Sequence, residues 1–167
     1  MITKLALFNT QPAPEAEQSL LTCCGSKTWA RTLVANRSYP TAEALIKAST
    51  KLWFTLSEAD WLEAFAHHPR IGETRSPTTA FLTHSESEQS ATQQTISNIA
   101  DSLADLNRAY EQKFGFIYIV FASGRTAPEL LDLLKSRMLN TRTEELHEAA
   151  LQQNRITSLR LERWLQS

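Results

Sequence analysis

The chain has 167 residues, enough for one globular domain with one core, and its 42% apolar share argues against disorder. Its 17 basic and 18 acidic residues give a formal net charge of -1, which favours neither nucleic acid nor an anionic membrane as a partner. We expect a fold that is not all-β, because the chain has only 4 glycines. We also expect a cytoplasmic protein, because the sequence has no apolar run long enough to cross a bilayer and no signal-peptide pattern.

The first half of the chain shows helical periodicity bounded by capping residues. A short apolar segment over 2–8 precedes a helix over 14–23, which Gly25 is expected to close. Ser26 and Thr41 are expected to cap the next two helices. The apolar residues of these helices recur at steps of three and four, which predicts that they face the core: Leu20, Leu21, Trp29, Leu33, Val34, Leu45, Ala48, Leu52 and Trp53.

The two cysteines, Cys23 and Cys24, are neighbours in the sequence. Neighbouring cysteines rarely form a disulfide with each other, because the bond would strain the peptide that links them. We therefore expect both to be reduced and buried as small apolar residues.

The fourth helix ends at two histidines and a proline. Ser57 and Asp60 form a capping-box pattern at its start. The residue before a proline is pushed out of helical geometry, so His68, before Pro69, is expected at a stiff, non-helical corner that suits proton transfer. His67, on the last helical turn, is expected to be scaffold. The alternative for both histidines is a purely structural role at a helix end.

The second half is predicted to contain a polar loop and then a long helix, or two abutting helices, over 86–114. An apolar segment at about 115–122 has strand propensity, but no second strand is evident, so we expect it to be extended and buried among helices. Thr126 and Thr141 begin two further helices with capping-box patterns. The sequence therefore predicts an all-α, single-domain helical bundle over residues 1–167 with one extended buried segment.

Two acidic residues, Glu86 and Glu88, stand at the predicted start of the long helix, where negative charge is favoured. A carboxylate there could also face His68 and share proton-transfer work with it. A metal site is an alternative, but no His-Glu-x-x-His motif and no i, i+4 histidine pair supports it. The potential ligands are His67, His68, Glu73, His84 and Glu88.

In combination, several short motifs resemble one family, the 2-oxo-4-hydroxy-4-carboxy-5-ureidoimidazoline (OHCU) decarboxylases of urate breakdown. No single motif is specific, but their ordered combination is, and it covers nearly the whole chain. The motifs are Phe8-Asn9, Cys23-Cys24-Gly25-Ser26 with Trp29-Ala30, His68-Pro69-Arg70-Ile71-Gly72, Glu88-Gln89, Leu106-Asn107, Tyr110-Glu111, Lys113-Phe114-Gly115-Phe116, Gly124-Arg125 and Ile156-Thr157-Ser158-Leu159-Arg160-Leu161.

The resemblance implies site residues by motif. It implies that His68 and Glu88 are catalytic. Many family members have Phe-Gly-Phe-Pro where this chain has Ile117 in the last position, and an isoleucine adds an N–H donor and frees φ. The residues that it implies for substrate binding are Pro69, Ser85, Gln89 and Arg160, together with the backbone of Phe116, Ile117, Tyr118, Ile119 and Val120.

Members of this family convert OHCU to (S)-allantoin with loss of CO2, using no cofactor and no metal. The resemblance implies the same reaction here, with OHCU as the small-molecule partner and a homodimer as a common assembly. Decarboxylation needs an electron sink, and the C=N bond of the substrate ring supplies one. The protein has to place the carboxylate and protonate one face of the neighbouring carbon. A metal-dependent hydrolase of a ureide or cyclic amide and a non-catalytic helical binding module are the alternatives.

Overall fold

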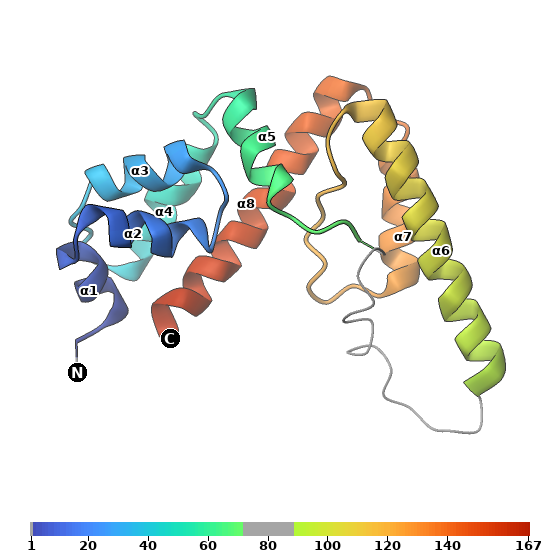
Figure 1. Ribbon diagram of the computed structural model, residues 1–167, viewed down its shortest axis with the longest axis horizontal. Coiled ribbons are helices and arrows are strands. Elements are labelled where there is room, and N and C mark those ends of the chain that lie inside the picture. The colour runs from blue at the N-terminus through green and yellow to red at the C-terminus, as the bar shows by residue number, and fades with distance from the viewer. Residues whose placement is uncertain (1, 72–88) are drawn as a thin grey trace. The chain divides into compact units, whose positions relative to one another are not determined.

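The computed structural model describes residues 2–71 and 89–167 of the chain. Within these residues the chain forms eight helices and no β-strand, so the predicted all-α fold is confirmed (Figure 1). The helices are α1 (Lys4–Thr10), α2 (Ala13–Leu21), α3 (Lys27–Ala35), α4 (Ala42–Trp53), α5 (Glu58–Ala66), α6 (Gln89–Phe114), α7 (Ala127–Arg137) and α8 (Arg142–Gln166).

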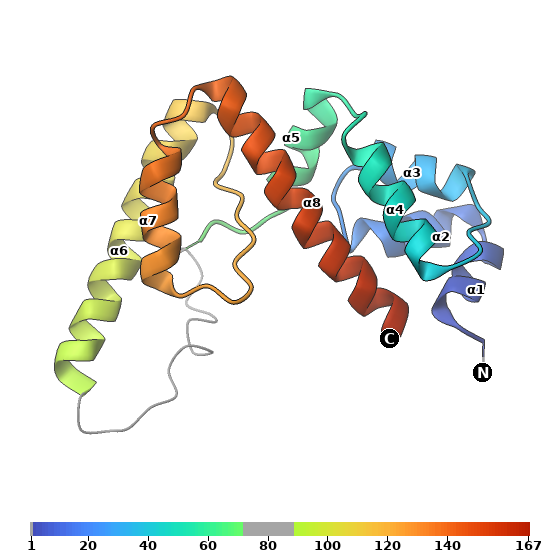
Figure 2. The ribbon, with the colours of Figure 1, turned by 180° about the vertical axis from the view of Figure 1, so that it is seen from behind.

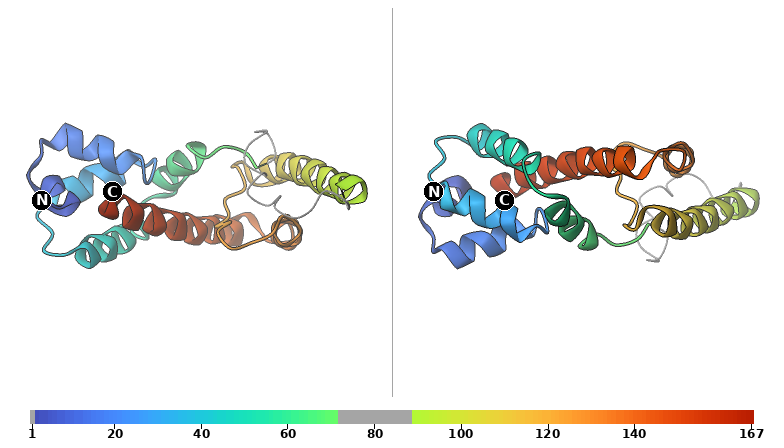
Figure 3. Two further views of the ribbon diagram at one scale, coloured as in Figure 1. Left: turned by 90° about the horizontal axis from the view of Figure 1, so that it is seen from below. Right: turned by 90° about the horizontal axis from the view of Figure 1, so that it is seen from above.

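The described residues divide into two compact units. The first unit contains residues 2–67 and 150–167, and the second contains residues 68–71 and 89–149. The helix α8 is continuous (Figure 3). Its residues 142–149 belong to the second unit and the rest to the first. The prediction of one domain over the whole chain stays a prediction. No helix among the described residues is long and apolar enough to cross a membrane.

In the first unit, side-chain caps set the helix starts as predicted. The side-chain oxygens of Ser26 and Thr41 accept hydrogen bonds from the first turns of α3 and α4, and Ser57 and Asp60 form the predicted capping box of α5. These caps satisfy N–H groups that have no partner inside the helix. The apolar pattern over 2–8 alone predicts no particular secondary structure, and most of this segment lies in α1, which Thr3 caps.

The core of the first unit is built around buried tryptophans. The helix α3 packs against α2, α4 and α5. Each buried indole N–H finds a neutral acceptor: Trp29 donates to Ser49 Oγ, Trp53 to the Ala150 carbonyl, and Trp61 to the Trp53 carbonyl. Burial of an aromatic ring whose polar atom is paired stabilises a core at little polar cost.

In the second unit, α6 and α7 lie side by side (Figures 1 and 2). The helix α6 ends at Gly115, whose φ of +82° is a left-handed conformation that glycine adopts without steric cost. Residues 115–126 then run without helix or strand to the capping box of Thr126 and Glu129, which begins α7. The prediction of a buried segment that forms no helix and pairs with no strand is confirmed for residues 116–120, whose side chains are buried or half-buried.

Candidate functional site

The histidine corner, defined here as residues 67–71, lies at the end of α5. His67 is the C-cap residue of that helix, with φ -83° and ψ -4°. His68 follows outside the helix and is half-buried, and Pro69 comes next. The sequence prediction of a helix that stops at the histidines and leaves His68 in a non-helical position is therefore confirmed.

In the first unit, the ring of His67 is packed against Gly25. A Cβ atom at position 25 would lie 2.5 Å from the Cγ and Cδ2 atoms of His67, closer than real Cβ contacts allow. The prediction that Gly25 closes the helix over 14–23 is wrong, because α2 ends at Leu21 with Thr22 as its C-cap. Glycine is needed here for space beside the histidine and not for helix termination. His67 thus contributes to the scaffold beside the predicted catalytic residue.

Two contacts attach the rest of the corner to α6 within the second unit. The Arg70 guanidinium donates two hydrogen bonds to the Glu111 carboxylate, at 2.8 Å from Nε and 2.7 Å from Nη2. The Asn107 amide donates to the Ile71 carbonyl at 2.9 Å. The guanidinium hydrogen bonds also hold the pKa of Glu111 below its usual value. These residues hold the chain directly after His68 and Pro69.

The extended segment forms a second group in this unit. We call residues 116–120 the wall; four of its five side chains are buried, and Ile117 is half-buried. Tyr110 of α6 packs its ring against Phe114, Phe116 and Tyr118, with centroid distances of 4.6, 5.8 and 5.3 Å. Because Tyr110 lies three residues after Asn107 and one before Glu111, one turn of α6 contacts both the corner and the wall.

Arg160 lies in the first unit, on α8. Its Nη1 donates to the Cys23 carbonyl at 3.4 Å. Cys23 and Cys24 are both free and buried, as predicted. Burial raises the pKa of Cys24 to about 11 and raises that of Cys23 as well. Both thiols therefore stay protonated at neutral pH and are poor nucleophiles.

The predicted site residues are distributed unevenly over the described chain. His68, Pro69 and the wall belong to the second unit, and Arg160 belongs to the first. Gln89 is the first residue of α6. Glu88 and Ser85 lie outside the described residues, as do the candidate metal ligands Glu73 and His84. Within residues 2–71 and 89–167, no group of three histidine, cysteine or acidic side chains is arranged to hold a metal ion.

Sequence reasoning gave no role to three residues that the structure ties to the corner: Arg70, Asn107 and Glu111. All three stand in the motifs that carry the family resemblance, so a signal was present. The sequence could not show that Arg70 pairs with Glu111, because 41 positions separate them.

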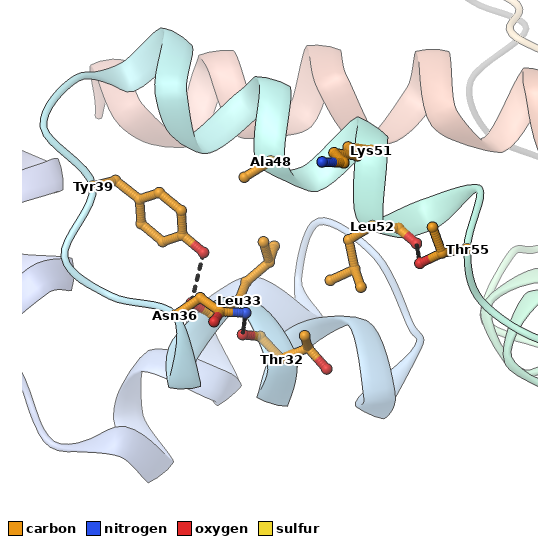
Figure 4. Close-up of a pocket in the computed structure, with 8 residues that line it drawn as sticks. All are labelled: Thr32, Leu33, Asn36, Tyr39, Ala48, Lys51, Leu52 and Thr55. Atoms are coloured by element: carbon orange, nitrogen blue, oxygen red, sulfur yellow. Dashed lines mark hydrogen bonds between the residues drawn. The ribbon is translucent and has the colours of Figure 1, made fainter.

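A cavity of about 300 Å3 lies between α3 and α4 in the first unit (Figure 4). It contains none of the predicted site residues. Its Tyr39 hydroxyl already donates to the Leu33 carbonyl, and its Asn36 amide donates to the Thr32 carbonyl. These two polar groups are thus used within the fold, and we do not take the cavity as the candidate site. The residues that line it are Thr32, Leu33, Asn36, Tyr39, Ala48, Lys51, Leu52 and Thr55.

The sequence model of the OHCU decarboxylase family matches residues 9–162, which run through both units and include the corner, the wall and Arg160. The chain belongs to the OHCU decarboxylase family. The predicted resemblance is therefore confirmed.

Relatives of known name agree with this membership. The chain is 43% identical over 143 residues to the uric acid degradation bifunctional protein TTL of Arabidopsis thaliana, covering 83% of this chain and 44% of the relative. It is 25% identical over 127 residues to the uric acid degradation bifunctional protein of Bacillus sp. (strain TB-90), covering 76% of this chain and 25% of the relative. The chain thus spans less than half the length of either relative.

Two solved structures share the fold. A crystal structure of OHCU decarboxylase in the presence of (S)-allantoin superimposes with a TM-score of 0.76 at 37% identity, covering 90% of this chain and 99% of that one. A crystal structure of (S)-allantoin synthase gives a TM-score of 0.71 at 21% identity, covering 96% of this chain and 53% of that one. The second likeness, at this low identity, concerns the fold alone.

Proposed function

We propose that this protein is a carboxy-lyase of urate degradation that decarboxylates OHCU to (S)-allantoin. The observation that carries the proposal is the family match over residues 9–162, which includes a His68-Pro69 corner held on α6 by two sets of contacts. The OHCU decarboxylase structure solved in the presence of (S)-allantoin, 37% identical over nearly its full length, supports the same reaction.

The reaction we propose divides into two steps. In the first, the C–C bond to the carboxylate breaks, its electron pair enters the conjugated ring through the C=N bond, and CO2 leaves. In the second, a proton is delivered to one face of the neighbouring carbon, which fixes the S configuration. The substrate supplies the electron sink, so the protein's task is positioning and proton transfer, and no cofactor is needed.

We assign His68 and Glu88 to the proton-transfer chemistry. A histidine is suited to it because its usual pKa lies close to neutral pH. The position of His68 after the end of α5, next to Pro69 and anchored through residues 70 and 71, favours one fixed orientation of the ring.

We assign substrate binding to Arg160, Ser85, Gln89, the Pro69 backbone and the wall. A guanidinium can hold a carboxylate through two parallel hydrogen bonds, which suits Arg160 to the departing group. The wall offers backbone groups of an extended segment, which can pair with the N–H and C=O groups of a ureide ring.

The enzyme is proposed to act in the cytoplasm, in keeping with its two free cysteines. A homodimer is proposed on the family resemblance, to be tested by light scattering after size exclusion.

The test uses freshly generated OHCU and follows the optical activity of allantoin by circular dichroism. OHCU also decays spontaneously to racemic allantoin, so only an enzyme gives net optical activity. Chelator-treated protein is expected to keep full activity, whereas a metal-dependent hydrolase would lose it. His68→Asn and Glu88→Gln should fold normally and lose at least about a hundredfold in kcat.

His67→Asn is the matched control for the histidine variant, because it changes the neighbouring ring without touching the proposed proton donor. It should retain most of the activity. Racemic product from the wild-type protein would contradict the proposed function, and full activity of both site variants would contradict the assignment of His68 and Glu88.

A further inference from the structure

The wall is next to a buried ion pair that lies wholly inside the second unit. Arg137 of α7 is 3% exposed and Glu145 of α8 is fully buried. The Nε of Arg137 donates to Glu145 Oε1 at 2.7 Å, and its Nη2 contacts the same oxygen. Glu145 also accepts hydrogen bonds from the Tyr110 hydroxyl at 2.5 Å and from the Asn140 amide at 2.8 Å. Both oxygens of the buried carboxylate therefore have partners.

The remaining edge of the guanidinium faces the wall. Arg137 Nη1 donates to the Ile119 carbonyl at 2.7 Å. The centre of the same guanidinium lies 4.8 Å from the centroid of the Tyr118 ring, a cation–π distance. One planar group thus binds Glu145 on α8 and two consecutive residues of the extended segment. A guanidinium can do this because its donors point in fixed, divergent directions within one plane.

The wall has a structural need for such a group. It forms no helix, and no strand is present in residues 2–71 and 89–167 to pair with it. A buried backbone carbonyl in an extended segment requires a hydrogen-bond donor from elsewhere. Arg137 provides a charged donor to the centre of the wall, and such a bond is stronger than a neutral one.

Stability alone does not account for the ion pair. Two apolar residues of similar volume would fill the same space without the desolvation cost of burying two charges. They could not donate to the Ile119 carbonyl, and they would leave the Tyr118 ring without its cation. What the pair contributes beyond packing is therefore a fixed backbone position at the middle of the wall.

We propose that Arg137 is a positioning residue for the substrate site, held by Glu145 and acting through the backbone of the wall. The proposal rests on the proposed function in taking the wall as a surface that contacts the substrate ring. A fixed wall presents one face of the ring to the proton donor, so the Arg137 contact governs substrate affinity and stereoselectivity. It takes no part in proton transfer.

Two variants distinguish a positioning role of Arg137 at the wall from the effect of burying a charge. Glu145→Gln removes the negative charge but keeps an amide oxygen that can accept from Arg137 Nε, so Arg137 stays held beside the Ile119 carbonyl. The double variant Arg137→Met, Glu145→Gln leaves no uncompensated charge and removes the donor to the wall. A third variant, Arg137→Lys, keeps the charge but cannot bind Glu145 and the wall with the same fork geometry.

The first measurement is amide hydrogen exchange, with residues 118–120 compared with amides of α6 in the same sample. We expect the double variant to exchange at least about tenfold faster at the wall relative to α6, and Glu145→Gln to resemble the wild type. Equal relative rates in the double variant and the wild type would overturn the proposal. If the double variant does not fold, Arg137→Lys decides the question, with an increase of a few-fold expected.

The second measurement is the enantiomeric excess of allantoin, together with KM and kcat. The double variant is expected to raise KM about tenfold and to give partly racemic product, while Glu145→Gln keeps the product enantiomerically pure. A purely structural role would lower the amount of active enzyme and leave the enantiomeric excess and KM of the remainder unchanged. A wild-type protein without decarboxylase activity would contradict the proposed function instead, and hydrogen exchange would still test the position of the wall.

Discussion

The interiors of the two units are held together by different chemistry. The first unit buries Trp29, Trp53 and Trp61, whose N–H groups donate to neutral oxygens. The second unit buries Arg137 with Glu145 and adds the Tyr110 hydroxyl to the same cluster. The difference follows from backbone regularity. In the first unit, helices satisfy most of their own backbone groups, so apolar packing is enough to build the core.

The second unit contains an extended segment that cannot satisfy its own backbone. Cationic side chains supply donors at and beside it. Arg137 donates to the Ile119 carbonyl, and Arg142 donates to the Phe114 carbonyl where α6 ends. Lys113 donates across to the Met138 and Asn140 carbonyls, which follow α7. The buried pair of Arg137 and Glu145 therefore lies where regular secondary structure is interrupted, next to residues proposed to contact the substrate.

The largest expected effect in testing this comparison comes from Arg137→Met. The variant leaves the buried Glu145 carboxylate without its cation, which should lower the free energy of unfolding by about 3–5 kcal/mol. Urea denaturation followed by far-UV circular dichroism measures the loss. Trp53→Phe, the matched change in the first unit, removes one neutral hydrogen bond and should cost about 1–2 kcal/mol. Equal losses in the two variants would remove the distinction between the cores.

Gly25→Ala should have the next largest effect, through packing alone. The new methyl group would overlap the His67 ring and should destabilise the protein by about 1–3 kcal/mol. Thermal denaturation of Gly25→Ala, His67→Ala and the double variant forms a cycle. The His67→Ala change should recover most of the loss caused by Gly25→Ala. Additive losses in the double variant would show that the two residues do not interact.

Alkaline pH should weaken the second unit through its buried phenols. Burial raises the pKa of Tyr118 to about 12, whereas an unfolded tyrosine ionises near about 10. At a pH between these two pKa values, Tyr118 loses its phenol proton in the unfolded chain and keeps it in the folded chain. The stabilising contribution is therefore complete below about pH 10 and decreases as pH rises, by about 1 kcal/mol at about pH 11.

Tyr118→Phe tests this contribution by urea denaturation across that pH range. The Tyr118 hydroxyl has no well-aligned hydrogen-bond partner among the described residues, so its removal should change stability little at neutral pH. The variant should lose stability less steeply above about pH 10. In the first unit, Tyr39→Phe removes a hydrogen bond to the Leu33 carbonyl and should cost about 1 kcal/mol at neutral pH. An unchanged alkaline slope in Tyr118→Phe would contradict the prediction.

The smallest effect is expected at the ion pair of the histidine corner. Arg70 and Glu111 are 45% and 34% exposed, so Glu111→Gln should cost less than about 1 kcal/mol of stability. The pKa of Glu111 is lowered in the folded state, so the contribution is present at neutral pH and is lost as pH falls below about 4.5. Asp105→Asn, in the exposed pair with Arg108 on the same helix, is the control and should be neutral.

If the Arg70–Glu111 ion pair holds the histidine corner in place for catalysis, its loss should affect activity more than stability. Glu111→Gln should then lower kcat several-fold while Asp105→Asn leaves it unchanged. Identical kinetics for the two variants would show that the Arg70 contact has no positioning role.

Local rules were sufficient to predict much of the architecture. The capping residues Ser26, Thr41 and Ser57 mark helix starts because their side chains pair with N–H groups only three residues away. The end of α5 at His67 follows from Pro69. Gly25 was predicted wrongly because a glycine can serve either a turn or a close contact, and only the position of the His67 ring distinguishes them.

By itself, the sequence determined the helices after α1, the non-helical segment over about 115–122, the family and the histidine at the proline corner. Each of these depends on residues near in sequence or on an ordered set of motifs. The tertiary structure decided which residues hold these elements in place. The pairing of Arg70 with Glu111 and the contact of Arg137 with Ile119 join positions 41 and 18 apart. Such contacts depend on how helices pack, which the local pattern around either residue does not encode.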